Sequence, residues 1–197
     1  MDIIIAGVGG QGTVLASRAL AQAAVAAGLD AITSETIGMA QREGVVQSHV
    51  RIGAGEAGPL IPDGAAELLI GFEPAEAARA LPKVKPGARA AINTAVVYPF
   101  TVALGASKYD PGTILSYLER TFPGAVMFDA TALAVEAGSR RAMNAVMLGA
   151  VAGLGLLPVP AEGVLAALLR MVRPAYRELN ERAFALGRGA VRKAGTA

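Results

Sequence analysis

The amino-terminal segment constrains the fold most, because a short apolar run passes directly into a cluster of glycines. Residues 3–6 read Ile-Ile-Ile-Ala, and residues 7–12 read Gly-Val-Gly-Gly-Gln-Gly. An apolar run that ends in turn residues predicts a buried strand, and the Ala- and Leu-rich stretch after the glycines predicts a helix. Glycines at the spacing G-x-G-x-x-G between a strand and a helix are typical of dinucleotide-binding folds. The three that fit are Gly7, Gly9 and Gly12.

Alternating strand and helix patterns continue after this turn and predict one α/β domain over residues 1–197. Strands are expected at 3–6, 31–34, 45–52, 67–71, 88–93 and 125–129. Helices are expected at 11–27, 73–81, 111–122, 131–138, 140–157, 161–171 and 174–187. The first strand, helix and second strand should form a right-handed parallel βαβ unit. We therefore expect a Rossmann-like, doubly wound, mostly parallel sheet over about residues 1–130, and a helical C-terminal part over about residues 131–190.

The composition excludes several classes of protein. Hydrophobic residues make up 53% of the chain and aromatic ones only 5%, and the net charge is +2, which does not fit a nucleic-acid binder. The chain has no cysteine, so it can form no disulfide and cannot ligate an iron–sulfur cluster by thiolates. No charged leader precedes the first apolar run, so we expect a cytoplasmic protein. The uncharged stretch 142–161 is interrupted by Pro158, which favours a buried helix over a membrane span.

Three roles are open to the glycine turn. It could hold the phosphates of a nucleotide, with Glu35, 23 residues after Gly12, binding a ribose hydroxyl. The glycines could serve only to pack the helix against the strand, or the helix N-terminus could receive an anion or a side chain of another subunit. The long side chain of Gln11 would stand near the path of a pyrophosphate. The residues expected to contact a cofactor are Gly7, Gly9, Gly10, Gln11, Gly12 and Thr13.

A polar stretch at residues 34–51 is the second candidate site. In a strand at 45–52, the side chains of Gln47, His49 and Arg51 share one face. That face is either an exposed side of the sheet or a surface that docks near the active site of a partner. Because His49 is the only histidine and the chain has no cysteine, this residue does not indicate a metal site. A structural hydrogen bond is favoured for it over acid–base catalysis.

Short motifs along the chain are characteristic of one protein family. They stand at residues 7–13, 34–42, 48–53, 71–77, 86–87, 144–150 and 179–184. Together they resemble the gamma-type subunit or domain of 2-oxoacid:ferredoxin oxidoreductases, and the resemblance covers nearly the whole chain. The motifs at 144–150 and 179–184 are most similar to the small subunit of indolepyruvate:ferredoxin oxidoreductase.

The resemblance implies a non-autonomous subunit of an enzyme that oxidatively decarboxylates a 2-oxoacid, here an aryl pyruvate, to an acyl-CoA. It implies a large partner subunit that carries thiamine diphosphate, Mg²⁺ and iron–sulfur clusters, with CoA as co-substrate and ferredoxin as the electron acceptor. A hetero-oligomer is therefore expected, with α2β2 as one stoichiometry. The side chains that could take part in catalysis are Glu35, Gln41, Arg42 and His49. The chain departs from the family pattern at Ala40 and Glu43, where Ser and Gly are common.

Two other functions remain open on the sequence alone. One is a free-standing NAD(P)-binding oxidoreductase, which the glycine turn and Glu35 favour. The other is an assembly module that takes no part in chemistry. The C-terminal region also concentrates basic residues that either face solvent or contact an acidic partner. These are Arg170, Arg173, Arg177, Arg182, Arg188, Arg192 and Lys193.

Overall fold

The fold is built on one six-stranded sheet, in the order β2-β3-β1-β4-β5-β6. The computed structural model describes residues 1–38 and 44–194, with side chains described as far as Val191. The strands are β1 (Asp2–Val8), β2 (Ala31–Ile37), β3 (Val45–Ile52), β4 (Ala66–Gly71), β5 (Val84–Asn93) and β6 (Val126–Phe128). β1, β4, β5 and β6 run parallel to one another. The expected mostly parallel, Rossmann-like sheet is confirmed.

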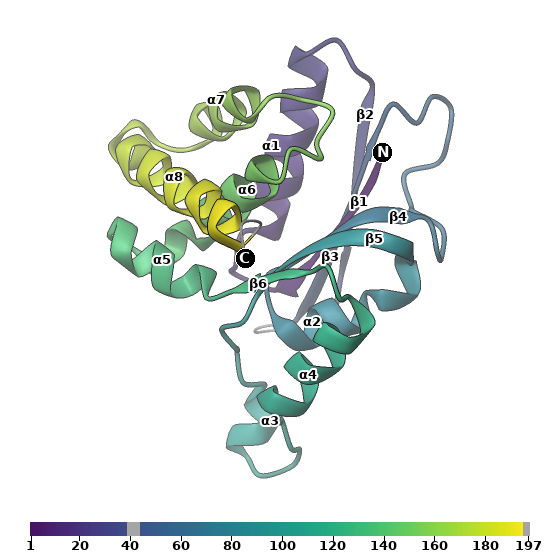
Figure 1. The fold of residues 1–197 in the computed structure, drawn as a ribbon, viewed down its shortest axis with the longest axis vertical. Helices are drawn as coiled ribbons and strands as arrows, with labels where there is room; N and C mark the ends of the chain where they lie inside the picture. Colours follow the sequence, from purple (N-terminus) through teal and green to yellow (C-terminus); the bar gives the residue numbers. More distant parts are fainter. Residues whose placement is uncertain (39–43, 195–197) are drawn as a thin grey trace.

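Helices cover both faces of this sheet (Figure 1). The helices are α1 (Thr13–Ala26), α2 (Pro74–Arg79), α3 (Phe100–Ala103), α4 (Pro111–Thr121), α5 (Ala130–Ala137), α6 (Met143–Gly153), α7 (Ala161–Met171) and α8 (Arg177–Ala194). Short 3₁₀ turns lie at Leu81–Lys83, Arg140–Ala142 and Pro174–Tyr176. α1 and α5–α8 pack on one face, and α2 and α4 pack on the other. α3, which the sequence did not predict, lies at the far end of the molecule from α7 (Figure 1).

One strand breaks the expected βαβ order. β3 lies between β1 and β2 and pairs antiparallel with both. The prediction that the first two strands form an adjacent parallel pair is therefore wrong, although α1 still connects them. A local pattern predicts that a strand exists, but its neighbours depend on contacts between distant segments, so the sequence reading missed the insertion.

The core lies on both faces of β1, which explains why its sequence is apolar without alternation. Ile3 and Ile5 point into the larger cluster beneath α1 and the C-terminal helices. Ile4 and Ala6 point into the smaller cluster beneath α2 and α4. All four side chains are fully buried. A strand covered on both faces needs apolar side chains at every position, which agrees with the buried strand predicted at residues 3–6.

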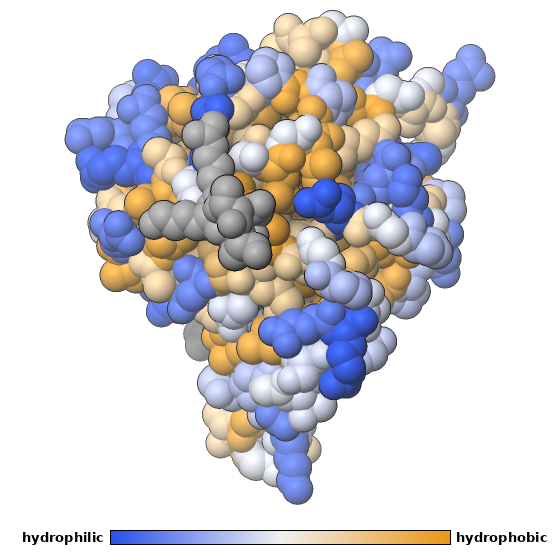
Figure 2. Space-filling view, in the orientation of Figure 1, coloured by the Kyte–Doolittle hydropathy of each residue, from blue (hydrophilic) through white to orange (hydrophobic). Residues whose placement is uncertain are grey.

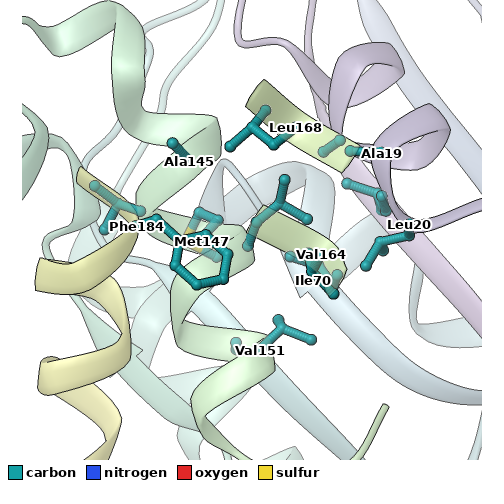
Figure 3. Close-up of a cluster of buried hydrophobic side chains, with 14 of the residues drawn as sticks. Ala19, Leu20, Ile70, Ala145, Met147, Val151, Val164, Leu168 and Phe184 are labelled. Carbon is teal, nitrogen blue, oxygen red and sulfur yellow. The ribbon is translucent and has the colours of Figure 1, made fainter. Parts of the chain in front are cut away.

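Helix α6 passes through the middle of the larger cluster. Figure 3 shows its side chains Ala145, Met147 and Val151 among those of α1, α7 and α8. The uncharged stretch 142–161 is thus a buried helix that ends at Gly153, shorter than the helix predicted over 140–157. Within residues 1–38 and 44–194, no helix is both long and apolar enough to cross a bilayer.

Helices α6 and α8 approach so closely that their backbones touch at two glycines. A Cβ atom on Gly149 would lie 2.0 Å from the carbonyl oxygen of Phe184, and one on Gly187 would lie 1.9 Å from that of Val146. Real Cβ atoms do not come this close to backbone atoms, so neither position accepts a side chain without moving a helix. The crossing therefore depends on these two glycines.

We predict that Gly187→Ala destabilises the chain by about 3 kcal/mol or more, because the methyl group would push the two helices apart. Gly189→Ala is the matched control on the same helix, since its Cβ would meet nothing within 4 Å. Alanine there should stabilise the helix by up to about 1 kcal/mol. Urea unfolding of both variants measures the difference. Equal effects of the two substitutions would contradict this description of the crossing.

Candidate functional site

The candidate site lies where the parallel strands β1, β4 and β5 end and where α1 and α6 begin. In open α/β sheets, ligands bind at this carboxyl edge of the strands. A cavity of about 200 Å³ opens here. It is lined by Gly10, Gln11, Ala95, Val96, Val97, Thr131, Arg140, Arg141 and Met143. The glycine turn therefore forms one side of the cavity, and a second segment of the chain, at residues 95–97, forms another.

Three glycines of the turn meet a steric or backbone requirement that a side chain would violate. A Cβ on Gly7 would lie 2.9 Å from the Cβ of Phe72, so β1 and β4 could not stay together. Gly10 and Gly12 have φ angles of 90° and 84°, which side chains rarely adopt. The N–H of Gly9 donates to the carbonyl of Gly44 at 2.9 Å. The backbone of this turn between β1 and α1 is therefore similar to the glycine-rich turn of Rossmann folds.

The side chain of Gln11 folds back onto the ends of two strands. Its Oε1 accepts from the N–H of Val8 at 2.9 Å, and its Nε2 donates to the carbonyl of Phe72 at 3.1 Å. Gln11 therefore joins the end of β1 to the end of β4 and takes up their last backbone groups. α1 begins only at Thr13, two residues later than predicted, because Gln11 belongs to the turn.

Hydrogen-bond donors gather around the start of α1. Among the described residues no side chain caps its N-terminus, and its first turn contains no acidic residue. Thr13, a predicted contact residue, is only 3% exposed. Asn144 is 4% exposed, and a Cβ on Gly12 would lie 2.7 Å from its Nδ2. Among the described residues this Nδ2 donates to no acceptor, while the Oδ1 accepts from the N–H of Ala145 at 2.9 Å.

Two arginines give the cavity its positive charge. Arg140 and Arg141 line it from the 3₁₀ turn before α6, and both are exposed. Neither forms an ion pair with an acidic residue in the described parts of the chain. The two guanidinium groups are donors in the cavity wall, and the start of α1 follows the glycine turn that forms another side, so the cavity is suited to an anionic group such as a phosphate.

These two arginines were not predicted as site residues from the sequence. A signal was present, because Arg140 and Arg141 follow the Gly138-Ser139 turn and come directly before the long uncharged stretch. Without the strand order, nothing placed that turn beside the glycines at residues 7–12.

Glu35 does not lie beside β1, as a ribose-binding acid on the second strand would. It lies on β2, opposite Ser48 of β3, and its Oε1 accepts from the Oγ of Ser17 on α1 at 3.3 Å. Because β3 intervenes, β2 is about 10 Å from β1 rather than about 5 Å. Gln41 and Arg42, with the departures at Ala40 and Glu43, lie outside the described residues.

His49 is a buried structural residue rather than part of an exposed face. It is 2% exposed, and its Nδ1 accepts from the N–H of Ile61 at 3.1 Å. Burial lowers the pKa of the imidazole, and the nearby charges of Lys83 and Arg51 lower it further. The alternative of a solvent-exposed polar face is wrong, because the segment around Ile61 covers it.

The rest of that strand face is also occupied. Gln47 is half-buried. The Nε of Arg51 donates to the Oδ1 of Asp2 at 2.9 Å, and its Nη1 donates to the carbonyl of Gly58 at 2.7 Å. These contacts hold the segment between β3 and β4 against the sheet. Among the described residues, no group of three or more His, Cys, Asp or Glu side chains could hold a metal ion.

Several of the C-terminal basic residues have structural partners. Arg182 pairs with Glu178 at 2.7 Å, and Arg188 pairs with Glu162 at 3.0 Å. The Nε of Arg177 donates to the carbonyl of Leu169 at 3.2 Å. Arg173 precedes the 3₁₀ turn Pro174–Tyr176, so it does not lie on the helix that carries Arg177. The side chains of Arg192 and Lys193 lie outside the description.

We predict that lowering the pH reduces the free energy of unfolding of the wild-type chain more steeply than that of the His49→Asn variant. The folded pKa of His49 lies below the unfolded value of 6.5, so the unfolded chain binds a proton that the folded chain excludes. The contribution of neutral His49 to the free energy of unfolding is then fully present above pH 6.5. It is lost as the pH falls below 6.5, by at most about 1.4 kcal/mol per pH unit. Urea unfolding between about pH 7.5 and 5.5 measures the slope. Equal slopes for the two proteins would show that His49 is not buried in its neutral form.

The whole chain matches known proteins. The family model for pyruvate ferredoxin/flavodoxin oxidoreductase matches residues 2–190. The chain is 38% identical over 188 residues to indolepyruvate oxidoreductase subunit IorB of Archaeoglobus fulgidus, covering 95% of this chain and 93% of that protein. A crystal structure of a keto/oxoacid ferredoxin oxidoreductase gamma subunit from Geobacter sulfurreducens matches with a TM-score of 0.73 at 25% identity, covering 98% of each chain.

A 2-oxoglutarate:ferredoxin oxidoreductase of Magnetococcus marinus shares the fold. The TM-score is 0.70 at 21% identity, over 98% of this chain and 31% of that longer one. The matches at both levels span the glycine turn, the sheet and the C-terminal helices. The chain belongs to the pyruvate ferredoxin/flavodoxin oxidoreductase family, as a protein of the gamma-subunit type.

Proposed function

We propose that this chain is the small subunit of a cytoplasmic indolepyruvate-type 2-oxoacid:ferredoxin oxidoreductase. The observation that carries the proposal is the identity of 38% to an indolepyruvate oxidoreductase subunit over 95% of the chain. The reaction converts an aryl pyruvate, CoA and oxidised ferredoxin to an aryl-acyl-CoA, CO₂ and reduced ferredoxin. The subunit works as part of a hetero-oligomer, with α2β2 as the simplest stoichiometry.

The chemistry of carbon–carbon cleavage and electron transfer belongs to a large partner subunit. This chain has no cysteine for an iron–sulfur cluster, and its sequence contains no Gly-Asp-Gly thiamine-diphosphate motif. Thiamine diphosphate, Mg²⁺ and the clusters are therefore assigned to the partner, which passes electrons to ferredoxin. What this chain supplies is a surface that binds and orients a co-substrate beside that centre.

The cavity at the glycine turn is the place where this chain would bind CoA. CoA is anionic at its phosphate groups and carries a neutral, flexible arm that ends in the thiol. The guanidinium groups of Arg140 and Arg141 line the cavity as donors for a phosphate, and α1 begins at Thr13, two residues after Gln11 of the lining. Holding the phosphates here would leave the thiol end free to reach the reacting carbon on the partner.

Ordinary NAD(P) binding fits this cavity less well. Its volume of about 200 Å³ is below the range of about 300–1,000 Å³ that is usual for ligand pockets. Gln11 lies across the ends of β1 and β4, and Glu35 is displaced by β3 from the position of a ribose-binding acid. The cavity therefore accommodates a terminal anionic group better than a whole dinucleotide.

We predict that Arg140→Ala and Arg141→Ala together raise the KM for CoA by about 10-fold or more, because a hydrogen bond to a charged group contributes about 1.5–3 kcal/mol. The kcat at saturating CoA and the KM for the 2-oxoacid should change little. Anaerobic assays of indolepyruvate-dependent ferredoxin reduction by the co-expressed complex measure these constants. Arg18→Ala and Arg120→Ala together, at two exposed arginines on α1 and α4, are the charge-matched control.

Four results would contradict the proposal. An unchanged KM for CoA would show that the cavity does not hold CoA. No oxidation of any 2-oxoacid by the complex would overturn the activity itself. Binding of NAD(H) to the isolated chain in calorimetry, without turnover by any complex, would favour the free-standing oxidoreductase. A complex that turns over equally well with all cavity variants would favour the assembly module.

A further inference from the structure

The wall of the cavity opposite the glycine turn belongs to a long segment that we name the arm, residues 94–110. It leaves the end of β5, lines the cavity at Ala95–Val97, projects outward as α3 and returns at Tyr109 to the start of α4. Figure 1 shows α3 lying apart from the sheet, and Figure 2 shows hydrophobic residues on that narrow end of the molecule. The position of this wall therefore depends on how the arm is attached.

The near end of the arm is attached by Asn93, which is fully buried. Its Nδ2 donates to the carbonyl of Phe72 at 2.9 Å, and its Oδ1 accepts from the N–H of Ala130 at 3.0 Å and from that of Ala95 at 3.3 Å. The carbonyl of Phe72 is the group that also accepts from Gln11. The first residues of the arm and the glycine turn are thus fixed to the same strand end.

The far end of the arm is attached by Tyr109. Its hydroxyl donates to the Oε1 of Glu73, which is 1% exposed, and the Oε2 of Glu73 accepts from the N–H of Glu76 at 3.1 Å to cap α2. Burial and the contact with Glu73 raise the pKa of the phenol, so Tyr109 keeps the proton that it donates. The ring of Tyr98 meets that of Tyr109 edge-on, with centroids 5.5 Å apart.

Between these two ends the arm is bonded to itself. The hydrogen bonds described for residues 99–107 stay within the arm, including a contact of 2.7 Å between the hydroxyls of Thr101 and Ser107. The arm therefore behaves as one piece held at Asn93 and at Tyr109. The Tyr98–Tyr109 contact lies directly after the cavity wall at Val97, so the far attachment acts on the wall itself.

We propose that Tyr109 and Glu73 are positioning residues for CoA, because their hydrogen bond holds the arm so that residues 95–97 close the cavity against the glycine turn. The inference rests on the proposed function of the cavity. Neither residue lines the cavity, so both act through the arm. The hydroxyl of Tyr109 bonds to a carboxylate that already caps α2, which makes the attachment rigid.

The test is Tyr109→Phe in the co-expressed complex, which keeps the ring and removes the hydroxyl. The KM for CoA should rise about five-fold, while the KM for the 2-oxoacid and the kcat at saturating CoA stay unchanged. Tyr117→Phe is the matched control, because this tyrosine is 46% exposed and its hydroxyl makes no hydrogen bond among the described residues. Hydrogen exchange should speed up at the amides of 95–97 and not in α8.

A second pair of variants tests the carboxylate. Glu73→Gln keeps an oxygen that can accept from Tyr109, so it should retain most of the affinity for CoA. Glu73→Ala removes the acceptor and should match Tyr109→Phe, provided that hydrogen exchange shows the chain to be folded. If Glu73→Ala does not fold, Tyr109→Phe and its exchange pattern decide the question alone.

The outcomes separate this inference from the proposed function. If the arginine variants raise the KM for CoA but Tyr109→Phe leaves both this KM and the exchange at 95–97 at wild-type values, the positioning role is overturned. A fall in kcat with no change in the KM for CoA, or a loss of the large subunit without a change in that KM, overturns it as well. If the arginine variants also have no effect, the cavity is not the CoA site and both proposals fail.

Discussion

The structure around the site depends on one amide side chain that joins two strands. Gln11 bonds to the N–H of Val8 and to the carbonyl of Phe72, so it fixes the end of β1 to the end of β4. Buried backbone groups left without partners are costly, and at this edge the strands have no further residues to pair with. By taking up these groups, Gln11 closes the turn, and among the described residues no side chain caps the start of α1.

This arrangement explains how a Rossmann-type turn can serve something other than a dinucleotide. In a dinucleotide-binding protein the phosphates lie on the turn, and an acid on the adjacent strand selects the ribose. Here β3 separates β2 from β1, and the carboxylate of Glu35 bonds to Ser17 instead. The turn retains backbone N–H groups that can bind an anion, but it lacks an acidic residue on the adjacent strand that would bind the ribose of a nucleoside. Arg140 and Arg141 in the cavity lining supply the positive charge.

Local patterns predicted the elements well and their neighbours poorly. The strand at Val45–Ile52 and the helix at Ala161–Met171 have the predicted bounds, because periodicity and flanking proline are local signals. The insertion of β3, the burial of His49 by Ile61 and the meeting of Arg141 with the glycine turn all depend on contacts between distant segments. The arm was missed because its only helix, α3, spans four residues without a periodic pattern.

We propose that the cavity at the glycine turn is where this subunit holds CoA beside the partner's thiamine diphosphate. A cryo-electron microscopy structure of the anaerobically purified complex with CoA would locate the bound CoA. We expect phosphate oxygens of CoA to lie within hydrogen-bond distance of Arg140 or Arg141 and of the first N–H groups of α1. A structure in which CoA binds wholly on the large subunit, with this cavity filled by a side chain of the partner, would contradict it.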